Sequence, residues 1–214
     1  MKKLLLALSL AAGTQIGMGA TIFWTDWTAV TTGQVVGTIT TPRATVNVIY
    51  SGNIFFAQTA GGTNYWIPPD PYLSPFVDNA PPDPDIIAIK GGLANTVTFS
   101  EPVLNPLLAI VSLNGPGFIF ADDPALEVLS SGCGSQGCGT LQVVGGNQVS
   151  TVGGAEGNGV VRLNGAHASF AFDGGAEEWR GIQVGIIANP EPRTWALLLG
   201  GGIALLVFKR MRSA

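Results

Sequence analysis

Turn signals divide the central part of the chain into short segments. Gly-Gly and Asn-Gly pairs recur between residues 21 and 188, as at Asn114-Gly115 and Asn164-Gly165. The segments between them alternate apolar and polar residues or form short β-branched runs, and none keeps a 3.6-residue apolar repeat. Both kinds of pair tolerate positive φ and therefore favour hairpins. This pattern predicts an all-β domain at residues 21–188.

About a dozen short strands indicate a two-sheet β-sandwich of the jelly-roll kind, with a closed barrel as the alternative. Connections of unequal length favour the sandwich. The longest connection, residues 67–85, contains seven prolines and cannot be a central strand, so we expect an extended surface loop packed by Tyr72 and Phe76. The predicted strands are residues 21–27, 34–40, 44–50, 54–58, 86–90, 96–100, 107–113, 118–121, 126–129, 140–144, 148–152, 159–163, 168–172 and 181–187.

The first twenty residues have the layout of a secretory signal peptide. Two lysines precede an apolar run from Leu4 to Ala12, and small residues continue to Ala20. The apolar run is too short for a normal membrane span. We therefore expect a signal helix at residues 1–20, removed by signal peptidase, and export of the domain that follows.

The C-terminal segment, residues 189–214, joins a proline motif to an apolar run and a basic end. The apolar run from Trp195 to Phe208 has 14 residues. As a helix it would span about 21 Å, which is short of a hydrocarbon core of about 30 Å. By the positive-inside rule, the basic residues Lys209, Arg210 and Arg212 would hold that end in the cytoplasm and leave the domain outside.

This segment resembles the PEP-CTERM sorting signal of Gram-negative bacteria. The resemblance implies that an exosortase recognises the tail and processes it near the motif, so that the apolar helix crosses the inner membrane only transiently. A permanent single-pass anchor is the alternative. The likeness rests on a Leu/Gly-rich span, on the basic end, and on the motif residues Pro190, Glu191, Pro192, Thr194 and Trp195.

The central region resembles an ectodomain type that recurs among proteins with PEP-CTERM tails. The resemblance implies location and fold, and it assigns no chemistry. Relatives have a serine or threonine stretch and a Trp where this chain has residues 166–172, so no role follows for His167. The segments that carry the likeness, each weak alone but in a shared order, are residues 24–28, 46–52, 77–82, 98–106, 154–159 and 177–186.

Cys133 and Cys138 are the two cysteines of the chain and stand in a glycine-rich segment. Export would place them in an oxidising compartment, and we predict a local disulfide worth roughly 2 kcal/mol by the chain-entropy estimate. A zinc site would need two further ligands, which one histidine cannot complete. We therefore expect no zinc site and no redox chemistry.

Acidic residues dominate the central region, where 13 acids stand against 4 basic residues. The net charge of about −9 would repel phosphate backbones, so we exclude nucleic acid as a partner. Structural Ca²⁺ is an alternative to solvated loop acids, although no EF-hand spacing is present. The acids that could supply oxygen ligands are Asp83, Asp85, Asp122, Asp123 and Glu127. We expect no cofactor and no other metal.

No catalytic set is visible in the sequence, which has neither a nucleophile elbow nor a phosphate loop. The sequence therefore predicts a non-enzymatic cell-surface or extracellular-matrix protein with a structural or adhesive role in envelope, biofilm or floc. The alternative is a lectin-like module that binds exopolysaccharide through Tyr65, Trp66 and Trp179. A hydrolase would need two opposed carboxylates in a cleft.

Overall fold

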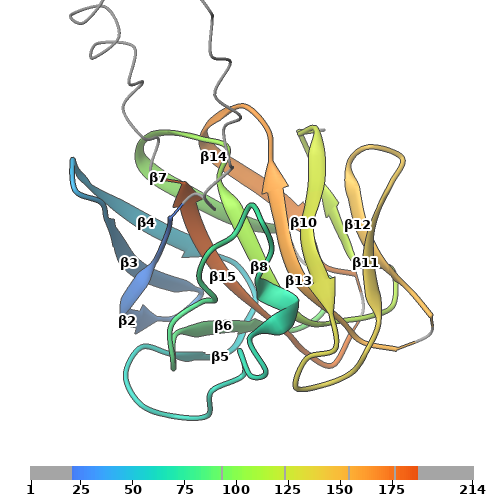
Figure 1. The fold of residues 1–214 in the computed structure, drawn as a ribbon. Helices are drawn as coiled ribbons and strands as arrows, with labels where there is room; N and C mark the ends of the chain where they lie inside the picture. The colour runs from blue at the N-terminus through green and yellow to red at the C-terminus, as the bar shows by residue number, and fades with distance from the viewer. Residues whose placement is uncertain (1–20, 93, 123, 154, 176, 188–214) are drawn as a thin grey trace, which may run out of the picture.

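The computed structural model describes residues 21–187 except for positions 93, 123, 154 and 176. These residues form an all-β sandwich of two antiparallel sheets (Figure 1). The predicted signal helix, sorting motif, C-terminal helix and basic end lie outside the described residues. Within the described part of the chain, no helix is long and apolar enough to cross a membrane.

Sheet A has seven strands, in the order β10-β13-β8-β15-β6-β5. β1 also belongs to it and pairs with the C-terminal end of β15, while β6 pairs with the N-terminal end. Its strands are β1 (Ile22–Trp24), β5 (Ile54–Gln58), β6 (Ile86–Ile89), β8 (Leu107–Leu113), β10 (Leu126–Gly132), β13 (Gly157–Leu163) and β15 (Arg180–Ile187).

Sheet B has eight strands, in the order β11-β12-β9-β14-β7-β4-β3-β2. The side chains of β3 and β4 alternate between buried and exposed or half-buried positions, because one face packs on sheet A and the other faces solvent. The strands of sheet B are β2 (Asp26–Thr31), β3 (Gln34–Thr40), β4 (Thr45–Ser51), β7 (Ala94–Leu104), β9 (Phe118–Phe120), β11 (Thr140–Val144), β12 (Gln148–Val152) and β14 (Ala166–Asp173).

The central strands of sheet A are buried on both faces. One face meets sheet B across the main core, which includes Trp27 and Phe118. A second apolar cluster, which includes Trp66 and Tyr72, covers the other face. Tyr72 comes from the proline-rich connection and Trp66 directly precedes it. The short 3-10 helix η1 (Asp70–Tyr72) of this connection contacts β10 and β13 (Figure 1). This double burial explains why every residue of β8 is buried.

The proline-rich connection was predicted as a surface loop packed by two aromatic residues. Tyr72 is buried as expected and meets Trp66 edge-on at 5.1 Å between ring centroids. Phe76 instead is 58% exposed, so its predicted packing role is wrong. The loop is therefore an outer layer of the fold and not only a surface connection.

The predicted strand at residues 21–27 is two strands that belong to different sheets. Thr25 lies between them, and both its backbone N–H and its hydroxyl donate to the carbonyl of Val184 at 2.8 Å. Gln183 in turn donates to the carbonyl of Thr25 at 2.9 Å. These bonds fix the crossing, so that Trp24 joins the outer cluster of sheet A and Trp27 joins the main core.

Most of the glycine turns that predicted hairpins are crossings between the sheets. Asn114-Gly115 leads from β8 in sheet A to β9 in sheet B, and Asn164-Gly165 leads from β13 to β14. The turn at Gly145-Gly146 does close a hairpin, between β11 and β12. Positive φ is present in both situations, with Gly115 at 56° and Gly145 at 61°. The turn residues therefore mark a chain reversal without deciding which sheet receives the next strand.

Candidate functional site

A cavity of about 340 Å³ lies at one end of sheet A. The C-terminal end of β8 meets the N-terminal ends of β13 and β15 there, because β8 lies between these two strands and runs antiparallel to both. Side chains next to these strand ends therefore converge, and a fourth segment from the disulfide loop joins them. The residues that line the cavity are Ser112, Asn114, Gln136, Glu156, Glu177, Glu178 and Trp179.

Ser112 has an unusual backbone in the cavity wall. Its φ is 64°, a left-handed value that serine adopts rarely, and its side chain is buried. The backbone N–H donates to the amide oxygen of Asn158 at 3.1 Å, and the hydroxyl donates to Glu156 at 2.7 Å. Opposite, the pairing of β13 with β8 shifts register between Gly157 and Gly159. The irregularity turns the Ser112 hydroxyl toward Glu156, an arrangement typical of functional sites.

Glu177 forms the buried floor of the same site. Its side chain is 5% exposed and lies 3.2 Å from the guanidinium Nε of Arg180. Burial raises the pKa of Glu177, while Arg180 and the amide groups of Asn114 act in the opposite direction. Neither carboxylate oxygen has a partner at full hydrogen-bond geometry among the described residues. A buried acceptor of this kind gains energy from any donor that reaches it.

Arg180 does not face the cavity. It is fully buried, and it donates to the carbonyls of Gly117 at 3.3 Å and Gly175 at 3.1 Å. Its guanidinium carbon also lies 5.3 Å from the ring centroid of Phe118 in the main core. Arg180 therefore neutralises the charge of Glu177 from the core side. Glu156 and Glu178 line the cavity without such a basic partner.

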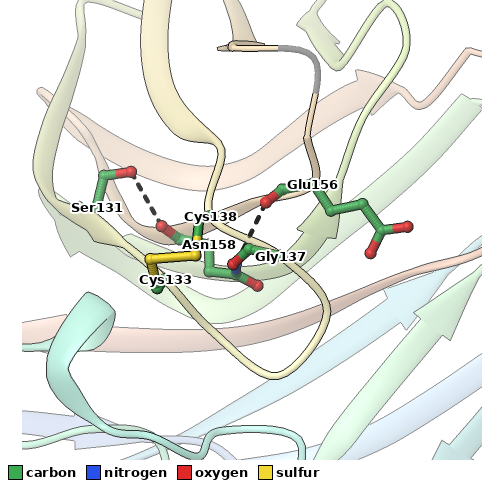
Figure 2. The surroundings of a disulfide bond; sticks show 6 residues. All are labelled: Ser131, Cys133, Gly137, Cys138, Glu156 and Asn158. Atoms are coloured by element: carbon green, nitrogen blue, oxygen red, sulfur yellow. Dashed lines mark hydrogen bonds between the residues drawn. A yellow bond between two sulfur atoms is a disulfide. The ribbon is translucent and has the colours of Figure 1, made fainter.

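The disulfide loop closes one side of the site. The sulfurs of Cys133 and Cys138 are bonded, as predicted, with Cα atoms 3.9 Å apart (Figure 2). Asn158, which is fully buried, donates to the carbonyl of Gly137 at 2.9 Å. Figure 2 shows the carboxylate of Glu156 pointing away from the disulfide. The loop is thus held against β13 and presents Gln136 to the cavity.

An aromatic group continues the wall beyond the carboxylates. Trp179 is half-buried and meets Tyr65 edge-on at 5.3 Å between ring centroids. Phe56 lies 5.7 Å from the Trp179 ring and 5.9 Å from the Tyr65 ring. Two residues predicted to face a ligand, Tyr65 and Trp179, are therefore neighbours. Trp66 belongs to the outer cluster against which both residues pack; it is 2% exposed, and its indole N–H donates to the carbonyl of Asp85 at 2.9 Å. It does not line the cavity.

No family model, curated protein or solved structure matches this chain. The site is therefore interpreted from its own residues.

Among the described residues, the acids proposed as calcium ligands do not form a metal-binding group. Asp85 is buried and accepts a hydrogen bond from the backbone N–H of Trp27 at 3.2 Å. Glu127 pairs with Arg162 across β10 and β13, and Asp123 lies outside the described residues. Within the described part of the chain, no group of three His, Cys, Asp or Glu side chains could hold a metal.

Sequence reasoning named Trp179 but missed the other residues that line the cavity. Glu156 and Glu177-Glu178 stand about 20 residues apart in the chain, and nothing in their spacing joins them. They meet because β13, β8 and β15 are neighbours in sheet A. The one local signal of the site is that Glu177 and Arg180, which carry opposite charges, stand three residues apart. Side chains at this spacing can form an ion pair when the turn between them brings them together.

Proposed function

We propose that this chain is an exported, non-enzymatic cell-surface or extracellular-matrix protein, with a structural or adhesive role in envelope, biofilm or floc. One observation best supports a domain that is held at the cell surface. The N- and C-terminal strands of the domain end next to each other, and the cavity lies at the opposite end of β15. Ile22 pairs with Ile187, so both terminal segments join the domain at one point. The cavity is lined by Trp179, which precedes the other end of β15, about 24 Å away at 3.4 Å per residue.

Such a placement suits a domain that is delivered or held by its ends. A tail in the inner membrane would leave the cavity pointing away from the bilayer, on the periplasmic or outer side. The proposed partners are a signal peptidase, an exosortase-type enzyme and, transiently or permanently, the inner membrane. These partners come from the sequences of residues 1–20 and 189–214.

We also propose that the sandwich is of the jelly-roll kind. Supporting this, the strand orders β6-β15-β8-β13 and β7-β14-β9-β12 place successive strands of the chain in alternate sheets. The crossings after β6, β8, β12, β13 and β14 each lead from one sheet to the other. Interleaved Greek keys of this type occur in lectin and capsid domains.

Intact-mass analysis of the mature protein from its native host tests export and sorting. The expected mass lacks the residues up to Gly19 or Ala20, ends near Pro190–Pro192, and is two hydrogens lighter than the reduced chain. Any added glycan would appear in the same spectrum. A mass that retains every residue through Ala214 would contradict processing of the tail, and one that retains Met1 would contradict export by a cleaved signal.

The alternative function is carbohydrate binding by a lectin-like module. The observation that favours it is the cavity, which joins amide, hydroxyl and carboxylate groups to the Trp179 ring, since sugar sites combine polar groups with an aromatic surface. Binding of labelled protein to a glycan array is expected, and it should be lost when Trp179 is replaced by alanine. Silence on every glycan would remove this alternative while leaving the export proposal intact.

A further inference from the structure

We propose that the cavity binds a sugar that carries a protonated amine, with the ammonium group near Glu156 and Glu178 and the ring against Trp179. This inference rests on the carbohydrate-binding function proposed for the same cavity. It goes further by assigning a ligand charge and by naming which side chains would recognise it.

The charges around the cavity select a cation. Glu156, Glu177 and Glu178 line it, and no described lining residue is basic. Arg180 offsets Glu177 from the core side and donates its other N–H groups to backbone carbonyls. Two carboxylates therefore remain uncompensated. Such a site attracts an ammonium group and repels a uronic acid.

Two other basic side chains of the described residues also make contacts away from the cavity. Lys90 lies over the ring of Phe55, with its Nζ 5.2 Å from the ring centroid. Arg162 pairs with Glu127 on the side of sheet A near β10. Among the described residues, no basic side chain lines the cavity beside Glu156 and Glu178.

The rest of the lining suits the body of a sugar. The half-buried indole of Trp179 offers an apolar face for a pyranose ring and attracts a cation through its π system. Asn114 and Gln136 also line the cavity and carry amide groups that can bond to sugar hydroxyls. Glu177 adds a 5% exposed carboxylate whose two oxygens lack a hydrogen-bond donor of full geometry. A cavity of about 340 Å³ is at the small end of the range for ligand sites, which suits one or two sugar units.

Calorimetry on the purified full chain in mild detergent tests the inference with three probes. These are a β-1,4-linked glucosamine tetrasaccharide, its N-acetylated counterpart and a uronic acid tetrasaccharide. The measurement is made at about pH 6, so that amines whose pKa is lowered by electron-withdrawing neighbours, like the α-amino group, are still largely protonated. We expect the glucosamine probe to bind about ten-fold more tightly than the N-acetylated one at about 0.05 M salt. That advantage should fall to about two-fold at about 0.5 M salt, because screening weakens the charge interaction.

Two substitutions and a matched control separate charge from stacking. Glu178→Gln should weaken binding of the glucosamine probe about five-fold and leave the N-acetylated probe unchanged. Trp179→Phe should weaken both probes. Glu101→Gln makes the same charge change on the exposed end of β7, which leads into the start of β8 and so lies away from Ser112. It should change neither affinity.

Each of the other outcomes contradicts a different part of the inference. Equal affinity for the glucosamine and N-acetylated probes would overturn the ammonium assignment and keep the sugar site. Equal weakening by Glu178→Gln and Glu101→Gln would show that net charge, and not this cavity, attracts the probe. Absence of binding to all three probes would remove both the inference and the lectin-like alternative, and export would stand on the mass measurement alone. Release of shortened sugars would show a hydrolase and overturn simple binding.

Discussion

Replacement of Arg180 by methionine is expected to lower the free energy of unfolding by about 3–5 kcal/mol. The reason is the charge that it leaves behind. Glu177 is 5% exposed, and Arg180 is its one ion-pair partner among the described residues. Loss of the guanidinium would also leave the carbonyls of Gly117 and Gly175 without their side-chain donors. Urea denaturation followed by tryptophan fluorescence would measure the change.

The matched control is Arg162→Met, which breaks a pair with Glu127 whose side chains are 25% and 45% exposed. Exposed pairs contribute about 0–1 kcal/mol, so this variant should remain close to the wild type. The double variant Arg180→Met with Glu177→Gln should recover at least half of the lost stability, because no buried charge remains. Equal costs for Arg180→Met and Arg162→Met would contradict the view that Glu177 depends on Arg180.

Much of the fold could be predicted from the sequence, because strand formation depends on local patterns. Predicted segments such as residues 34–40 and 107–113 are strands with those bounds. The division at Thr25 could not be predicted, since it depends on hydrogen bonds to Gln183 and Val184, about 159 residues away in the chain. The apolar run at residues 22–24, followed by Thr25, Asp26 and Trp27, carries no mark of a change of sheet.

The glycine turns show the same limit. A glycine with positive φ reverses the chain, but the next strand goes to whichever sheet buries its apolar side. β9 belongs to sheet B and places Phe118 and Phe120 in the main core between the sheets. The turn at Gly115 therefore leads from sheet A to sheet B. The predicted hairpin there failed for this non-local reason.

The cavity could not be predicted from the sequence, for a related reason. Its acids come from segments near residues 156 and 178, and only the neighbouring positions of β13, β8 and β15 bring them together. Trp179 could be named because aromatic residues are few and recognisable. Ser112 could not, because its left-handed φ arises from the register shift opposite Gly157 and from its bond to Asn158.

Replacement of Asp85 by asparagine is expected to stabilise the protein at neutral pH and to leave its stability unchanged below about pH 4. Burial raises the pKa of Asp85 from 3.8 to about 6, against the opposing effect of the Trp27 N–H, which donates to the carboxylate at 3.2 Å. The carboxylates of Asp26 and Asp83 raise it further. The folded state therefore binds this proton more tightly than the unfolded state does.

The sign of the pH dependence follows from that difference. The contribution of Asp85 is fully present below the unfolded pKa near 3.8 and is lost as the pH rises through the folded pKa of about 6. The loss amounts to roughly 2–3 kcal/mol at most. Asparagine keeps an acceptor for the Trp27 N–H and carries no charge, so the gain of Asp85→Asn over the wild type should grow between about pH 4 and pH 6.

Unfolding by urea at several pH values measures this gain, with Asp70→Asn as the control at an exposed acid of η1. The control should run parallel to the wild type throughout. A variant Asp85→Asn that is less stable than the wild type by the same amount at pH 4 and pH 7 would contradict the argument. It would show that Asp85 acts in the fold as a hydrogen-bond acceptor alone, with the carboxylate charge satisfied by Trp27 and its surroundings.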